Sequence, residues 1–141
     1  MRVVTIDGGP LRIDDVVAVA DGLATVEVAE NVAERMRPAR DLVEQVVAEN
    51  RTVYGITTGF GRLATTHIDS EEAAQLQVRL LRSHASGVGE RLRDRTVRAM
   101  LLLRARTLSQ GYSWVRPVIV ERLVELLNKG VLPVVPGQGS V

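Results

Sequence analysis

Two segments in the second half of the sequence constrain the fold most, because each combines a helical repeat with residues that end helices. In the segment 92–110, leucines and arginines alternate at helical spacing, and Gly111 follows at the C-terminal end. The segment 116–129 has Pro117 where the first turn of a helix tolerates proline, and Gly130 closes it. The sequence therefore predicts two long helices here and a mainly α fold.

A further long helix is predicted at about 69–86. Asp69 can cap its first turn while Glu72 reaches back, which makes a capping box with aspartate in the cap role. Four side chains then recur at three- and four-residue steps and so share one face of the helix: Ala73, Leu76, Leu80 and His84.

The first third of the chain is less regular. Residues 13–22 indicate a short helix with acidic residues in its first turn, and residues 23–30 alternate weakly, as a brief extended piece would. The pattern from 29 to 50 is helical, but Pro38 is expected to break or kink it. At the other end of the chain, prolines and valines predict an extended tail over 130–141.

Composition excludes several classes of protein. A chain of 141 residues with 45% hydrophobic content can bury the core of one domain. The absence of cysteine excludes disulfides, thiolate nucleophiles and cysteine metal sites, and His67 has no partner at metal-ligand spacing. No apolar run approaches the roughly 20 residues that span a bilayer, and the N-terminus lacks the features of a signal peptide. We therefore expect a cytoplasmic protein with no metal and no membrane partner.

Positive charge is concentrated locally although the net charge is only +1. The segment 79–106 contains eight arginines, at positions 79, 82, 91, 93, 95, 98, 104 and 106. They lack the interleaved aromatic side chains that stack on bases, so we expect no nucleic-acid partner. A solvated helix face, or a contact with acidic residues of a partner chain, is the favoured interpretation.

A glycine-rich loop over about 52–66 is the clearest candidate for function. In its first part, "TVYGITTGFGRL", Tyr54 is followed by glycines, which favour unusual backbone angles, close approach or movement. The candidate lid residues are Gly55, Thr57, Thr58, Gly59, Phe60 and Gly61. From residue type alone, Tyr54 is either a packed anchor or a working phenol.

Other candidates carry less information. A lone histidine on an apolar face, such as His84, is more often a satisfied buried histidine than a ligand. Ser140 has no activating partner nearby, and the "GVGE" stretch at 87–90 is too short to indicate a phosphate loop.

Four motifs in order give the sequence a family resemblance: "VYGITTGFGRLA", "LQVRLLRSHASGVGE", "GYSWVRP" and "LLNKGVLPVVPGQGSV". From about Ile13 to its end, the chain resembles the N-terminal part of the histidine, phenylalanine and tyrosine ammonia-lyases. It is most similar to the histidine-specific branch. Arg79 departs from the common motif, and Trp114 stands where the family usually has a small residue. These two departures leave the subfamily open.

The resemblance implies a fold and a cofactor. It implies a bundle of long helices in a homotetramer, with residues 1–141 as the N-terminal segment of a larger chain. The electrophile would be 4-methylideneimidazol-5-one (MIO), formed from an Ala-Ser-Gly expected just beyond Val141. A break at a modified residue, proteolysis or a split enzyme would each give a chain that stops there.

The resemblance also implies roles for the site residues. Tyr54 matches the catalytic base, carried on a lid that closes over an amino acid substrate. His84, in the pair Ser83-His84, matches the position that selects the substrate's side chain. The implied reaction is non-oxidative deamination of L-histidine to urocanate and ammonia. Tyrosine ammonia-lyase or tyrosine 2,3-aminomutase activity is the alternative, and a non-catalytic helical interaction module is the competing class.

Overall fold

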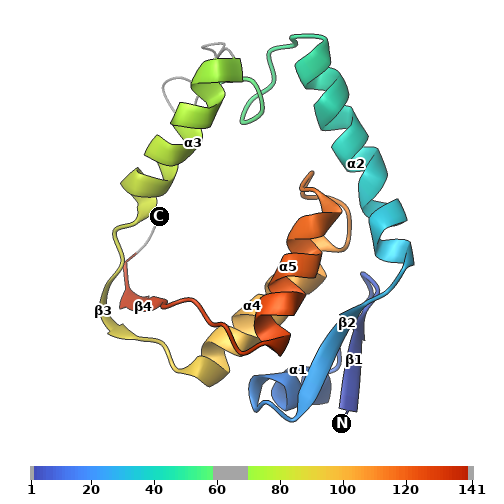
Figure 1. Ribbon diagram of the computed structural model, residues 1–141, viewed down its shortest axis with the longest axis vertical. Helices are drawn as coiled ribbons and strands as arrows, with labels where there is room; N and C mark the ends of the chain where they lie inside the picture. The colour runs from blue at the N-terminus through green and yellow to red at the C-terminus, as the bar shows by residue number, and fades with distance from the viewer. Residues whose placement is uncertain (1, 59–69, 140–141) are drawn as a thin grey trace.

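The computed structural model of the chain describes residues 2–58 and 70–139, and Figure 1 shows their arrangement. The prediction of a mainly α fold is confirmed, with five helices and four short strands in the described part. In chain order the elements are β1 (Arg2–Ile6), α1 (Ile13–Ala20), β2 (Ala24–Val28), α2 (Asn31–Ala48), α3 (Ser70–His84), β3 (Val88–Arg91), α4 (Asp94–Leu108), α5 (Pro117–Asn128) and β4 (Pro136–Gln138).

The N-terminus forms a small β-α-β unit. Strands β1 and β2 pair in parallel, with Arg2 opposite Ala24 and Ile6 opposite Val28, and helix α1 connects them. Burial alternates along β1, where Val4 and Ile6 are buried, as expected for a strand with one covered face. The extended piece expected at 23–30 is therefore β2, whereas β1 was not predicted.

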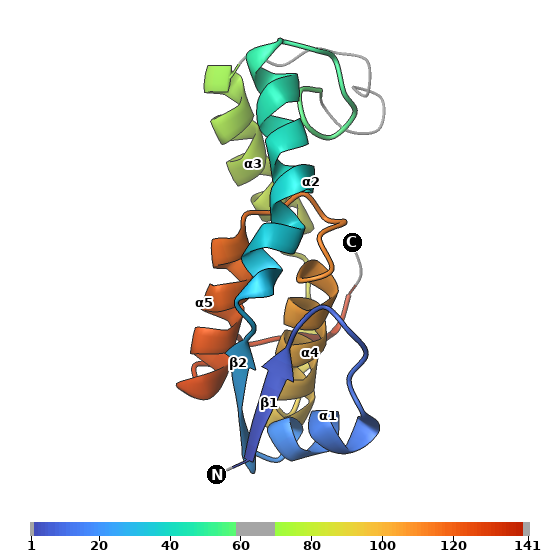
Figure 2. The ribbon, with the colours of Figure 1, turned by 90° about the vertical axis from the view of Figure 1, so that its right-hand side faces the viewer.

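The hydrophobic core lies where α4 and α5 pack against this β-α-β unit, in the lower half of the molecule in Figure 2. Val19, Leu102, Ala105 and Val120 are completely buried. The apolar repeat of the two long segments near the C-terminus thus forms the centre of the fold. Replacing a buried leucine here by alanine typically costs about 2–5 kcal/mol, so these residues dominate stability.

The edge of β2 that does not pair with β1 is hydrogen-bonded to the side chain of Asn128. The Asn128 amide accepts a hydrogen bond from Val26 N at 2.9 Å and donates one to Val26 O at 2.7 Å. A carboxamide carries one acceptor and one donor group, so it replaces a neighbouring strand at this position. The last residue of α5 is thereby fixed to the middle of β2.

The arginines of α4 do more than face solvent, which corrects part of the expectation from the sequence. Arg98 Nε donates to Val19 O at 2.9 Å, and Arg106 Nε donates to Gly9 O at 2.8 Å. Arg95 forms an ion pair with Asp21. A guanidinium suits these contacts because it offers several donors on a long apolar stem. These three arginines therefore join α4 to the N-terminal unit.

Helix α2 continues through Pro38, so the expected break is wrong. Proline removes a single N–H donor from the helix, and buried residues on both sides, Val32, Met36 and Val46, hold the two halves in place. Helices α2 and α3 extend away from the core, at the right and the left of Figure 1, and their upper ends approach each other at the top of that view. Asp69 and the Glu72 side chain lie outside the described residues, so the capping box stays a prediction.

Trp114 adopts a left-handed backbone conformation with φ of 60°. L-residues enter this region at a cost of about 1–2 kcal/mol, whereas glycine does so freely. This conformation gives a physical reason why a small residue suits this position.

Candidate functional site

The turn that carries Tyr54 is held by two buried threonines. Thr57 Oγ1 accepts a hydrogen bond from Val53 N at 2.9 Å and donates one to Arg51 O. Thr58 Oγ1 accepts one from Gly55 N at 3.3 Å. Both threonines are buried, whereas Tyr54 is 60% exposed. The buried threonines therefore anchor the turn, and the tyrosine ring faces largely outward.

Gly55 has a backbone reason to be glycine, since its φ is +75°. The remaining predicted lid residues, Gly59, Phe60 and Gly61, lie outside the described part of the chain. The role of the lid therefore stays a prediction.

His84 is the last residue of α3 and is exposed in this chain. Its Nδ1 lies 2.9 Å from Leu80 O and 2.9 Å from Ser83 Oγ. Leu76 and Leu80 are partly buried, so burial along this face decreases toward the histidine. The ring therefore stands at the edge of the fold, held through one nitrogen.

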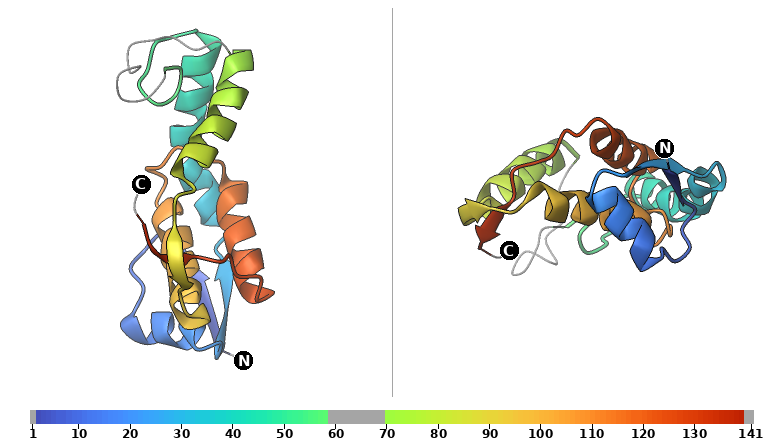
Figure 3. Two further views of the ribbon diagram at one scale, coloured as in Figure 1. Left: turned by 90° about the vertical axis from the view of Figure 1, so that its left-hand side faces the viewer. Right: turned by 90° about the horizontal axis from the view of Figure 1, so that it is seen from below.

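The C-terminal tail returns to this histidine. Strands β3 and β4 pair antiparallel, with Val88 opposite Gln138 and Arg91 opposite Pro136, and Leu92 N donates to Val135 O at 2.8 Å. Figure 3 shows the two strands just beyond the C-terminal end of α3. The stretch 87–90, considered above as a phosphate loop, is instead the strand that holds the tail.

Glycines make this pairing close. A Cβ at Gly137 would lie 2.9 Å from Glu90 O, and a Cβ at Gly139 would lie 3.0 Å from the Cα of Gly87. A Cβ at Gly87 would in turn lie 2.9 Å from Cγ of Pro136. The two glycine-containing stretches therefore fit together at a distance that side chains would prevent.

A cavity of about 430 Å³ opens where these elements meet. It is lined by His84, Ala85, Ser86, Gly87, Val134, Pro136, Gln138 and Gly139. Gln138 was not identified from the sequence; the Gly-x-Gly spacing around it is the signal that could have pointed to a close approach of the backbone here. Tyr54 does not line this cavity, so the described structure brings the tail, but not the tyrosine, to the histidine.

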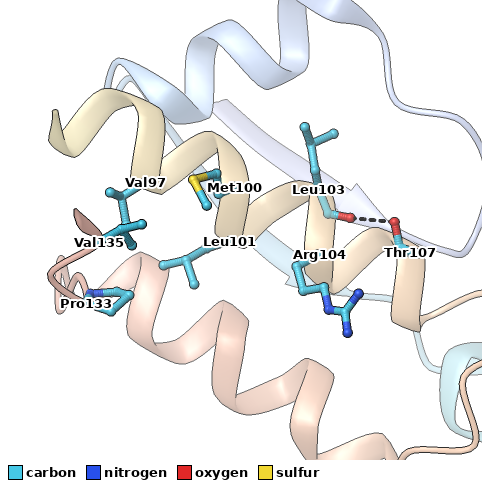
Figure 4. A pocket seen from close by; sticks show the side chains of 8 residues that line it. All are labelled: Val97, Met100, Leu101, Leu103, Arg104, Thr107, Pro133 and Val135. Atoms are coloured by element: carbon cyan, nitrogen blue, oxygen red, sulfur yellow. Dashed lines mark hydrogen bonds between the residues drawn. The ribbon is translucent and has the colours of Figure 1, made fainter. Parts of the chain in front are cut away.

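A second hollow, of about 470 Å³, runs along α4 (Figure 4). It is lined by Val97, Met100, Leu101, Leu103, Arg104, Thr107, Pro133 and Val135. The Thr107 hydroxyl donates to Leu103 O at 2.9 Å, within the helix. The lining is apolar apart from Arg104 and Thr107, so this hollow lacks the acid and base groups that chemistry needs.

Metal-binding and membrane-spanning features are both missing from the described residues. No cluster of three or more His, Asp or Glu side chains there has the arrangement of a metal site. None of the helices in residues 2–58 and 70–139 has the length and apolar character to cross a membrane.

Comparison with known proteins gives consistent results. Residues 11–141 match the family described as aromatic amino acid lyase. The chain is 45% identical over 140 residues to histidine ammonia-lyase of Streptococcus gordonii, covering 99% of this chain and 27% of that protein. The chain therefore spans about a quarter of the length of such relatives.

Two solved structures are also similar. Histidine ammonia-lyase from Trypanosoma cruzi shares 37% identity with a TM-score of 0.88, covering 99% of this chain and 27% of that one. Tyrosine aminomutase from Streptomyces globisporus shares 36% identity with a TM-score of 0.89, covering 99% and 26%. The two enzymes are about equally similar in fold and sequence.

Proposed function

Because the chain belongs to the aromatic amino acid lyase family, we propose that it is the N-terminal segment of a protein that converts L-histidine to urocanate and ammonia. The observation that carries this proposal is the cavity shared by His84 and the tail residues Gln138 and Gly139. It lies where the proposed cofactor and the proposed selectivity residue would have to meet.

The proposed cofactor is MIO, formed from an Ala-Ser-Gly just beyond Val141. The arrangement of this chain suits that group, because the glycine-to-glycine pairing of Gly87 with Gly139 fixes the tail beside the cavity. When formed, the group would supply the electrophile that makes the substrate's amino group a leaving group.

Tyr54 is the proposed base for the β-carbon of the substrate. A free phenol has a pKa of about 10, so a tyrosine needs positive surroundings to accept a proton near neutral pH. The proton would move from the β-carbon to the phenolate oxygen. The threonine-anchored turn leaves Tyr54 60% exposed, which suits a residue that must reach a ligand. In this proposal the lid, Gly55 to Gly61, closes the site and excludes water.

We propose a homotetramer, in which active sites combine residues of several subunits. This would bring Tyr54 to a cavity that it does not line within its own chain. Exposed apolar side chains on α3 support the assembly, since Val78 is 47% exposed and Leu81 is 73% exposed. Surfaces of this kind are common at protein interfaces.

The experiment that tests the proposed function uses the complete protein. Purified protein incubated with L-histidine should release urocanate, and its intact denatured mass should be lower than the coded mass by the two waters lost on cyclisation. An unmodified mass together with no turnover of any aromatic amino acid would leave the non-catalytic interaction module as the better explanation.

A second candidate is a tyrosine ammonia-lyase or tyrosine 2,3-aminomutase. The similarity to tyrosine aminomutase favours it, at 36% identity and a TM-score of 0.89. A histidine at position 84 can bond a phenol hydroxyl as well as an imidazole, because both carry a donor.

Replacing His84 by leucine should identify the substrate. We expect kcat/KM for L-histidine to fall about tenfold or more, because a polar substrate group would lose its hydrogen-bond partner in the closed site. Turnover of L-phenylalanine should appear or rise in the same variant. Steady-state kinetics with histidine, tyrosine and phenylalanine measure both effects. If the variant loses tyrosine turnover instead, the second candidate is supported. Unchanged preferences would remove His84 from the site.

A further inference from the structure

The hydrogen bonds of His84 fix which of its ring nitrogens carries the proton. Nδ1 lies 2.9 Å from Leu80 O and 2.9 Å from Ser83 Oγ. The Ser83 hydroxyl itself donates to Leu80 O at 2.9 Å. The three groups form a closed set at the C-terminal end of α3.

Only one proton arrangement satisfies this set in the neutral ring. A carbonyl oxygen can only accept, so Nδ1 must donate to Leu80 O. The Ser83 proton is already directed to the same carbonyl, so the serine oxygen can only accept from Nδ1. Both neighbours of Nδ1 are therefore acceptors, and the proton lies on Nδ1.

We infer that Ser83 and the Leu80 carbonyl hold His84 in the Nδ1–H tautomer, so that Nε2 presents a lone pair to the cavity and selects a substrate side chain with a hydrogen-bond donor. Ser83 is then a positioning residue that acts through His84. The inference rests on the proposed function, in which the side chain of the substrate lies beside His84. The nearby Gln138 amide both donates and accepts, so it cannot make this selection.

The acceptor nitrogen of His84 distinguishes ring-containing substrates by whether the ring carries a hydrogen-bond donor. An imidazole N–H and a phenol O–H both supply a donor. A pyridine ring of similar size offers only an acceptor, which would face the Nε2 lone pair, and a phenyl ring offers neither. The opposite tautomer would remove this preference, because imidazole and pyridine both offer a nitrogen that accepts a hydrogen bond.

Binding measurements on the complete protein test this inference. Titration calorimetry on the Tyr54→Phe variant, in which turnover should be blocked, compares L-histidine with 3-pyridyl-L-alanine. We expect histidine to bind at least about tenfold more tightly. In a Ser83→Ala background this preference should narrow about fivefold, the factor that corresponds to one ordinary hydrogen bond. Ser83→Thr keeps the hydroxyl and should restore the preference.

Thr107→Ala is the matched control, because it also removes a hydroxyl that donates to a carbonyl of its own helix, but Thr107 lies on α4 and does not line this cavity. It should leave the preference unchanged. Equal binding of the two ligands to the starting protein, or a preference that Ser83→Ala leaves intact, would overturn the inference. Failure of the proposed function would give a different result, because the protein without substitutions would then neither bind nor deaminate histidine.

Discussion

The Tyr54→Phe variant of the complete protein should lose about 10²–10⁴-fold in kcat, the usual contribution of a general base. The change removes only the phenol oxygen, which is the atom that would take the substrate proton. Folding should be unaffected, because Thr57 and Thr58 supply the hydrogen bonds that hold the turn. Steady-state kinetics, with thermal unfolding measured alongside, checks both parts.

The second tyrosine of the chain provides the control. Tyr112 is 83% exposed and has no proposed role, so Tyr112→Phe should change neither kcat nor thermal stability. Retained turnover in Tyr54→Phe would mean that another group removes the proton. Equal losses in both variants would indicate a general effect of the substitution rather than catalysis.

The Gly137→Ala variant should misplace the tail and lower activity at least about tenfold. Its Cβ would lie 2.9 Å from Glu90 O, a backbone atom that cannot move without opening the β3–β4 pair. Overpacking of this kind costs about 1–3 kcal/mol. The intact mass of the complete protein shows whether cyclisation also fails. In that case a fraction of the variant molecules should keep the water that the starting protein loses. Activity, mass and thermal unfolding together check this prediction.

The Gly130→Ala variant is the control for Gly137→Ala, because it shows the effect of backbone strain without the effect of close packing. Gly130 has a φ of +68°, and no atom lies within 4 Å of the position that a Cβ would take, so alanine there meets only the conformational cost of about 1 kcal/mol. Gly137 is not in the left-handed region, so its substitution reports the close approach alone. If both variants keep full activity and full modification, the glycine fit does not position the tail.

The long helices were predictable because their signals are local. In α4 and α5 the apolar repeat and the closing glycines lie within one segment, and the repeat forms the core. Strand β1 was missed because five residues carry little pattern, and their partner β2 lies beyond a helix. Strand β4 lies within the tail that was predicted to be extended, but β3 and its pairing with β4 were missed because glycines leave no side-chain alternation to detect.

The site was predictable only in part. Tyr54 and His84 stood out by residue type and family resemblance, and His84 lies exposed at the end of α3. Gln138 became a candidate only through pairing of the tail with residues far earlier in the chain. Tertiary contact, which no local pattern encodes, decides which side chains share a cavity.

The bond between Asn128 and β2 has a consequence for biosynthesis. The two residues it joins, Val26 and Asn128, are 102 positions apart. While the ribosome is still translating the intervening segment, the β-α-β unit emerges with an open strand edge and without the helices that cover its apolar side. An exposed edge of this kind can pair with other nascent chains. Correct folding of the N-terminal unit thus depends on completion of α5, and premature termination before Asn128 would leave an aggregation-prone product.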